Sequence, residues 1–501
     1  MRRVALTSAV AVLMAIGGAQ AQDLRIGLQD DPDTLDPAKN FSFVGRHVLT
    51  SVCDKLVDIA PDQTIVPQLA LSWQTSADGK ALELKLRPNV KFHDGEPFNA
   101  AAVKFNIERM ITMPDSRRRS ELALVKSAEA VDDLTVRLHL SAPFSPLLAQ
   151  FADRPGMMVS PKAVQSAGDS FGNKPVCAGP YRLVQRIVQD RIVLEKFPEH
   201  WNAGAYHFKT ITFTGIPDGT VRLANLRSGQ LDLIERLAAT NVPTVKQDPK
   251  LAVVPAQSLA YQTILFNIAN GEGAKNPFAI NVKLRQALEL SIDRAALNDV
   301  VFAGAFVPGN QAIPPGNRFY AQAIPIPQRD VEKAKALVKE SGVASPTLTI
   351  LVPSDNERQL AAQVVQAMAK EAGIDIRIQA VELISMLAQQ RQGNFEATFY
   401  GWSGRVDPDG NLHYLLTCNA PTNDPRYCNP ELDALLNEAR TKTDMATRKA
   451  LYDKALAIID RDKPMVVLYH QPWIFAMSSR LQGFAPYPDG IIRLTNVKLG
   501  S

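Results

Sequence analysis

The sequence is poor in cysteine, in excess charge of either sign and in long apolar segments. It has four cysteines among 501 residues, and 55 basic against 51 acidic side chains leave a net charge of only +4. So small an excess does not predict binding to nucleic acid, which needs a basic patch or stripe. Beyond the first residues, no stretch is long and apolar enough to cross a bilayer.

Several catalytic motifs are also missing. The chain contains neither H-E-x-x-H nor G-x-x-x-x-G-K-[ST], so a zinc protease and a phosphate-loop ATPase are not predicted. The run Gly401–Arg405 begins like the serine-hydrolase elbow G-x-S-x-G but ends in arginine. His93 beside Asp94 has no third group to complete a catalytic set, and a turn whose polar groups bond to the local backbone is favoured there.

The first 21 residues have the pattern of a secretory signal. Arg2 and Arg3 provide the charged region, Val4–Ile16 the apolar region, and a small-x-small cleavage site follows. We expect the mature chain to begin at Gln22 in the periplasm. Because no cysteine follows the cleavage site, a lipid anchor is not expected.

The four cysteines are Cys53, Cys177, Cys418 and Cys428. In an exported chain disulfides are the default, and four cysteines allow three pairings. Cys418 with Cys428 would close a short loop, which leaves Cys53 to pair with Cys177. The alternative is a zinc site, but the spacings match no C-x2-C pattern.

Strands and helices alternate between residues 347 and 400. The pattern predicts strands at Thr347–Val352, Ile374–Ala380 and Phe395–Tyr400, and helices at Asn356–Ala372 and Glu382–Arg391. Strands joined through helices of this length pair in parallel, so the fold class is α/β. Ligands of such sheets bind at the carboxyl ends of the strands.

The loop after the third of these strands is the main candidate site. It carries Tyr400, Gly401, Trp402, Arg405, Asp407 and Asp409. Trp402 either stacks on a ligand or fills the core at the strand end. Arg405 either pairs with Asp407 or holds a ligand carboxylate. The alternative for the whole loop is an ordinary polar surface connection.

Two stretches resemble one known family. They are Leu86–Ala100, with Lys-Phe-His-Asp-Gly at 91–95, and the loop with Gly401-Trp402 followed by Asp407-Pro408-Asp409. Both are similar to the family 5 solute-binding proteins of bacterial ABC importers, which include dipeptide- and oligopeptide-binding proteins. The resemblance implies a two-lobed periplasmic-binding-protein fold of type II, in the large variant with an extra subdomain in the first lobe. It also implies a monomeric carrier without catalytic activity or cofactor.

Such a carrier captures a peptide-like solute between its lobes and delivers it to an inner-membrane permease with separate ATPase subunits. The alternatives are a non-peptide ligand, such as a nickel complex or an opine, and, from another class, a secreted hydrolase. A set of nucleophile, base and orienting group is missing for the last.

The resemblance also implies roles for particular residues. Asp407 best matches the family's aspartate that holds the amino group of a bound peptide. The acidic stretch Asp30–Pro37 matches the rim of the cleft, and Asp30 and Phe43 complete the expected ligand-binding set. Dipeptide binders carry an arginine near 352–358 for the ligand carboxylate. Here the segment is shorter and Arg358 falls within a predicted helix, which argues against strict dipeptide specificity.

The domain boundaries follow from the same comparison. The core of the first lobe is expected from 22–51, 175–263 and 480–501, its extra subdomain from 52–174, and the second lobe from 264–479. The chain should cross between lobes near Tyr261–Asn267 and again near Arg480–Phe484.

Overall fold

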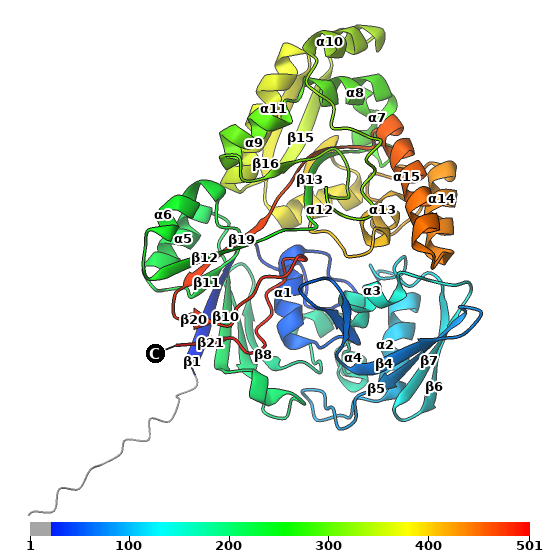
Figure 1. The fold of residues 1–501 in the computed structure, drawn as a ribbon, viewed down its shortest axis with the longest axis vertical. Helices are drawn as coiled ribbons and strands as arrows, with labels where there is room; N and C mark the ends of the chain where they lie inside the picture. Colours follow the sequence, from blue (N-terminus) through cyan, green and yellow to red (C-terminus); the bar gives the residue numbers. More distant parts are fainter. Residues whose placement is uncertain (1–21, 501) are drawn as a thin grey trace, which may run out of the picture.

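The computed structural model describes residues 22–500, and the predicted signal segment lies outside them. Three bodies are visible in Figure 1: an upper lobe, a lower left lobe that holds both described chain ends, and a smaller body at the lower right. None of the helices between residues 22 and 500 is long and apolar enough to cross a membrane.

The lower left body, the first lobe, is built on a mixed seven-stranded sheet. Its strands, in spatial order, are β12 (Leu251–Ala256), β19 (Trp473–Ser478), β11 (Leu233–Ile234), β1 (Gln22–Leu28), β10 (Phe208–Gly215), β9 (Arg191–Lys196) and β8 (Tyr181–Ile187). The helices of this lobe are α1 (Phe43–Val52), α4 (Pro161–Ala167), α5 (Gly219–Arg227) and α6 (Val242–Lys246). A short pair, β20 (Leu481–Gln482) with β21 (Lys498–Leu499), holds the C-terminal segment.

Within this sheet β1 pairs in parallel with β11, with Gly27 opposite Ile234. Parallel strands end at the same edge of a sheet. The residues that follow the two strands, Asp30 after β1 and Arg236 after β11, are therefore brought to one edge.

The smaller body contains an antiparallel sheet of β4 (Ala70–Thr75), β5 (Ala81–Leu86), β7 (Thr135–Leu140) and β6 (Val125–Asp132). The hairpin β2 (Val57–Ile59) and β3 (Ile65–Pro67) and the helices α2 (Ala100–Thr112) and α3 (Leu147–Phe151) complete it. In β5 apolar and polar residues alternate, and Leu82, Leu84 and Leu86 are buried between more exposed neighbours. The body lies within the stretch 52–174 that was expected to form the extra subdomain.

The second lobe is built on a six-stranded sheet. In spatial order its strands are β14 (Val307–Pro308), β18 (Met465–His470), β13 (Tyr261–Phe266), β17 (Ala397–Trp402), β15 (Thr347–Pro353) and β16 (Asp375–Val381). The parallel pairing predicted from the strand–helix alternation is confirmed for β15 with β16 and for β15 with β17. All six residues of β13 and of β18 are buried, as expected for central strands covered on both faces.

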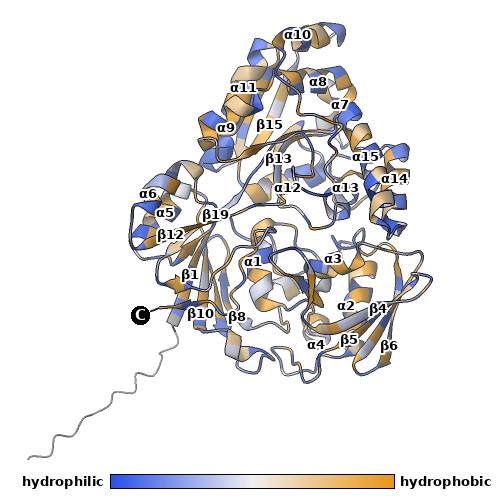
Figure 2. Ribbon diagram, viewed as in Figure 1, coloured by the Kyte–Doolittle hydropathy of each residue, from blue (hydrophilic) through white to orange (hydrophobic). Residues whose placement is uncertain are grey.

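Two groups of helices provide this cover. One face packs against α7 (Pro277–Ile280), α8 (Val282–Ser291), α9 (Arg294–Phe302), α10 (Val331–Glu340) and α11 (Asn356–Glu371). The other packs against α12 (Leu383–Gln392), α13 (Asp409–Leu416), α14 (Pro430–Thr441) and α15 (Met445–Asp462). Figure 2 shows the resulting pattern, with hydrophobic residues along the central strands and hydrophilic ones on outlying helices such as α10.

Sheet membership locates the two connections between the lobes. The chain leaves the first-lobe sheet after β12 and enters the second-lobe sheet at β13, so the first crossing is at 257–260. It returns between β18 and β19, at Gln471 and Pro472. The return therefore precedes the expected segment Arg480–Phe484, because β19 pairs with β12 and β11 in the first lobe.

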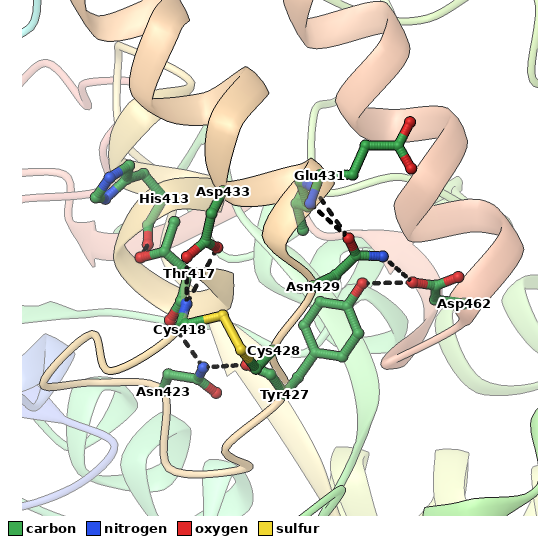
Figure 3. Close-up of a disulfide and its surroundings, with 11 residues drawn as sticks. His413, Thr417, Cys418, Asn423, Tyr427, Cys428, Asn429, Glu431, Asp433 and Asp462 are labelled. Atoms are coloured by element: carbon green, nitrogen blue, oxygen red, sulfur yellow. Dashed lines mark hydrogen bonds between the residues drawn. A yellow bond between two sulfur atoms is a disulfide. The ribbon is translucent and has the colours of Figure 1, made fainter.

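Both expected disulfides are present. Cys53 at the end of α1 is bonded to Cys177, at a sequence separation of 124 residues, and Cys418 is bonded to Cys428, ten residues away. The second bridge closes the loop between α13 and α14, and Figure 3 shows the backbone amide of Cys418 donating to the Asp433 carboxylate beside it.

Candidate ligand-binding site

A pocket lies between the two lobes and encloses a space of about 690 Å³, its open mouth included. The first lobe contributes its residues around positions 29–44 and Arg236, and the second lobe contributes Arg358, the start of α12 and the loop after β17. The full lining is Gln29, Asp30, Phe41, Ser42, Phe43, Val44, Arg236, Gln262, Arg358, Leu383, Met386, Leu387, Tyr400, Gly401, Trp402, Ser403, Arg405 and Gln471.

The loop after β17 is held in place by Asn411. The side-chain oxygen of Asn411 accepts from the indole N–H of Trp402 at 3.0 Å and from the backbone N–H of Arg405 at 2.7 Å. Gly404, between them, has a φ of 76°, and a Cβ there would approach the carbonyl oxygen of Leu259 to 2.2 Å. The loop therefore needs glycine at 404, and it places Trp402 and Arg405 in the pocket wall.

Arg405 forms an ion pair across the cleft. Its Nε lies 2.7 Å from Oδ2 of Asp153, which follows α3 of the smaller body and also binds Arg46 at 3.0 Å. All three side chains are at least 92 % buried. Burial alone would raise the pKa of Asp153, but Arg405, Arg46 and Arg154 outweigh burial and hold this pKa well below its ordinary value. One carboxylate thus faces several guanidinium groups at this end of the pocket.

A second centre of charge contains Asp30, Arg358 and Arg236. Arg358 lies in the first turn of α11, directly after the carboxyl end of β15, and its Nη2 is 3.8 Å from Oδ2 of Asp30. Its Nε binds Asp355, the N-cap residue of the same helix. Burial raises the pKa of Asp30 to about 6, although Arg358 opposes this shift.

Arg236 makes no ion pair within 4 Å with any residue in the range 22–500. Its guanidinium lies over the rings of Phe43 and Trp473, at 5.4 and 5.0 Å from their centroids. These rings stack on each other with centroids 4.7 Å apart. Packing therefore positions the Arg236 cation while its charge stays available to a ligand.

The sequence was compared with known proteins. The profile described as "Bacterial extracellular solute-binding proteins, family 5 Middle" matches residues 64–423. The glutathione-binding protein GsiB of Pectobacterium atrosepticum is 32% identical over 493 residues, which cover 96% of this chain and 94% of that protein. GsiB of Escherichia coli strain K12 is 30% identical over 490 residues, covering 95% and 94%.

Two solved structures agree with these matches. DppA of Helicobacter pylori, in complex with the peptide STSA, has a TM-score of 0.88 at 25% identity and covers 96% of this chain and 98% of its own. AgaA of A. tumefaciens R10, in complex with agropinic acid, has a TM-score of 0.86 at 25% identity, covering 96% and 99%.

The chain belongs to the family 5 bacterial extracellular solute-binding proteins. The predicted family, the two-lobed fold and the role as the solute-binding component of an ABC importer are confirmed. In this family 5 protein the structure brings six of the eight predicted ligand residues into the pocket lining. They are Asp30, Phe43, Tyr400, Gly401, Trp402 and Arg405.

The structure places the other two, Asp407 and Asp409, elsewhere. The chain turns into α13 at Asp409, and both carboxylates point toward later helices. Asp407 binds Arg448 of α15 at 2.8 Å, and Asp409 binds Arg440 of α14 at 2.6 Å. Neither lines the pocket, so the predicted amino-group anchor at Asp407 does not correspond to this geometry. Of the two alternatives for Arg405, the pairing with Asp407 is not the one seen, because Arg405 pairs with Asp153.

Sequence reasoning missed Arg236 and Gln262 and did not assign Arg358 to the site. The Gln262 amide nitrogen is buried without a hydrogen-bond partner among the described residues, and Gln262 lines the pocket. The available signal was that Arg358 follows a strand end of the alternating region, where ligands of parallel sheets bind. Arg236 follows the two-residue strand β11, which has no periodicity to detect.

The chain turns at His93 and Asp94 as expected, but the His93 ring bonds to the backbone of the distant segment 177–179 and not to its local backbone. His93 Nε2 lies 3.0 Å from the carbonyl oxygen of Gly179, and Asp94 accepts from Ser160. Burial lowers the pKa of His93 to about 4. No group of three or more His, Cys, Asp or Glu side chains in the described part of the chain is arranged to hold a metal ion.

Proposed function

We propose that this protein captures glutathione, or a short peptide with the same arrangement of charges, and delivers it to a membrane permease with separate ATPase subunits. It acts in the periplasm after removal of the first 21 residues, as a soluble monomer without a lipid anchor. The reaction is binding and release, with no bond made or broken.

The charge of the pocket is the observation that carries this proposal. Its lining holds three arginines, Arg236, Arg358 and Arg405, against a single carboxylate, Asp30. Glutathione has two carboxylates and one ammonium group, which is the complementary arrangement. A buried charge is costly unless a partner of opposite sign neutralises it. Arg405 and Arg358 have carboxylate partners in Asp153 and Asp355, whereas Arg236 has none within 4 Å among residues 22–500, so a ligand carboxylate suits Arg236 above all.

The similarity to relatives points the same way. The GsiB proteins named above carry a glutathione-binding description and align with 95–96% of this chain. Phe41, Met386, Leu387 and Trp402 supply apolar surface for the uncharged part of a peptide.

The alternatives fit less well. A nickel complex would meet no histidine or cysteine in the pocket lining described here. A hydrolase would need a base beside Ser403, but the Ser403 hydroxyl receives hydrogen bonds from Arg46 and Arg405 instead. An opine shares the carboxylates of glutathione and is the competitor that the experiment must separate.

Titration calorimetry on protein freed of copurified ligand tests the proposal. Glutathione should bind, whereas a neutral dipeptide such as Met-Leu and an opine should bind more weakly. Arg236→Gln should reduce the affinity for glutathione by about 30-fold, the effect of roughly 2 kcal/mol for losing one member of a desolvated charge pair. Arg236→Lys should give an intermediate loss, because lysine keeps the charge but not the planar guanidinium.

Arg377→Gln is the matched control. Arg377 is 69 % exposed, pairs within residues 22–500 with Asp375 alone, at 3.5 Å, and does not line the pocket. Its substitution should leave affinity unchanged. Failure of glutathione to bind, together with tight binding of a neutral dipeptide or an opine, would refute the proposal.

A further inference from the structure

Opposite charges lie next to each other at one end of the pocket. We infer that Asp30, Arg358 and Arg236 together hold a free α-amino-acid head group, whose ammonium and carboxylate share one carbon atom. The pocket would then select a γ-linked glutamyl peptide over its α-linked isomer. This inference rests on the proposed function and specifies which chemical end of the ligand this part of the pocket recognises.

Asp30 has unused capacity to accept hydrogen bonds. Its side chain is 14 % exposed and lines the pocket, and its carboxylate accepts no hydrogen bond from another residue in the part of the chain that the structure describes. The contact to Arg358, at 3.8 Å, is longer than a hydrogen bond. An ammonium group in the pocket can therefore bind Asp30 without displacing an existing partner.

The two arginines can receive the carboxylate of the same head group. Arg358 uses its Nε for Asp355, while its Nη2 faces Asp30 and the pocket. Arg236 comes to the same edge because β1 and β11 run parallel, and it adds a cation to the field at Asp30. Guanidinium groups bind carboxylates through two parallel hydrogen bonds, so either arginine suits this role.

The short spacing of the charges distinguishes the two linkages. In an α-linked tripeptide the ammonium and the free main-chain carboxylate stand at opposite ends, on the order of 7–10 Å apart when the chain is extended. A γ-glutamyl linkage uses the side-chain carboxyl and leaves both groups on one carbon. A cation and an anion separated by 3.8 Å match the second arrangement.

The remaining carboxylate of the ligand would bind at a second charge centre of the pocket, around Arg405. The charged neighbours that shift Asp30 are Arg358, Asp355, Arg236 and Glu235. The neighbours with the largest charge effects on the pKa of Arg405 are Arg46, Asp153, Glu121 and Tyr414, none of which is among those named for Asp30. The pocket has two distinct charge centres, and the one at Arg405 has an excess of guanidinium groups for the far carboxylate of a tripeptide.

Three ligands and the wild-type protein provide the first test. Glutathione should bind at least about 10-fold more tightly than α-glutamyl-cysteinyl-glycine, which has the same composition. N-acetylation of the glutamyl nitrogen, which removes the ammonium, should weaken binding by about 30-fold. These comparisons do not depend on whether a variant folds.

The Asp30→Asn variant provides the second test. It should weaken the binding of glutathione by about 30-fold and remove most of the preference for the γ linkage. In this variant, N-acetylation of the ligand should change the affinity very little. Asp31→Asn is the matched control, since Asp31 is the next residue, faces Arg186 at 3.6 Å and does not line the pocket. Circular dichroism and thermal unfolding verify that both variants are folded.

The outcomes separate this inference from the proposed function. If both isomers bind equally well to wild type, or if N-acetylation costs nothing, the head-group inference is wrong while glutathione binding stands. If neither isomer binds and a neutral dipeptide does, the proposed function fails.

Discussion

Replacing Asp407 by asparagine should cost stability and leave ligand affinity intact. The Asp407 and Arg448 side chains are 13 % and 6 % exposed, and Oδ1 and Nη2 are 2.8 Å apart. Removing one partner from a fully buried pair costs about 3–5 kcal/mol. The residual exposure of Asp407 and the hydrogen bond that asparagine retains reduce the expected loss to about 2–4 kcal/mol.

Two measurements on the same preparation show whether Asp407→Asn lowers stability without changing ligand affinity. Urea unfolding of ligand-free protein should show the loss of stability, and calorimetry should show glutathione affinity within about twofold of wild type. Asp375→Asn, the same substitution in a pair that is 64 % and 69 % exposed, should change stability by less than about 0.5 kcal/mol. A 10-fold loss of affinity in the Asp407 variant at unchanged stability would show that Asp407 contacts the ligand and that the pocket is wrongly assigned.

Three further predictions concern pH, the long-range disulfide and closure. Burial raises the pKa of Asp30 to about 6, so the carboxyl becomes protonated as pH falls through 6. In calorimetry the affinity for glutathione should therefore fall between pH 7.5 and pH 5, and the affinity of the Asp30→Asn variant should lack this pH dependence. Replacing Cys53 and Cys177 by serine opens a loop of 124 residues and should lower the free energy of unfolding by about 5 kcal/mol in denaturant titrations, whereas an unchanged midpoint would contradict this. Asp153→Asn weakens the ion pair with Arg405 across the cleft, so the unliganded variant should have a larger radius of gyration than wild type in small-angle scattering. Equal radii would mean that this pair does not hold the lobes together.

The alternation of strands and helices between residues 347 and 402 was predictable because local periodicity determines it. Each predicted element is present with its ends shifted by at most two residues, including β15, α11 and β17. In β5 the sequence alternates between apolar and polar residues with a period of two, and the burial of Leu82, Leu84 and Leu86 follows from that period. Parallel pairing then identified the edge of the sheet where Trp402 and Arg405 lie.

The direction of side chains within the loop was not predictable in this way. Arg405 and Asp407 are two residues apart, yet one lies in the pocket wall and the other faces α15. This difference depends on Arg448, 41 residues later, and on Asp153, 252 residues earlier, neither of which a local pattern connects with the loop. The gathering of Asp30, Arg236 and Arg358 at one end of the pocket likewise depends on strand order in two different sheets.

The arrangement of the two crossings has a consequence for how such proteins change ligand. The second lobe is one uninterrupted segment from β13 to β18, and its ends are neighbours in the same sheet, with Gln262 opposite Tyr469. That segment supplies Arg358 and Arg405, whereas Asp30 and Arg236 come from outside it. A single recombination event that exchanged this block of coding sequence between relatives would replace half of the recognition surface at once. The other half would be inherited unchanged, so new combinations of ligand groups could arise without gradual substitution at each position.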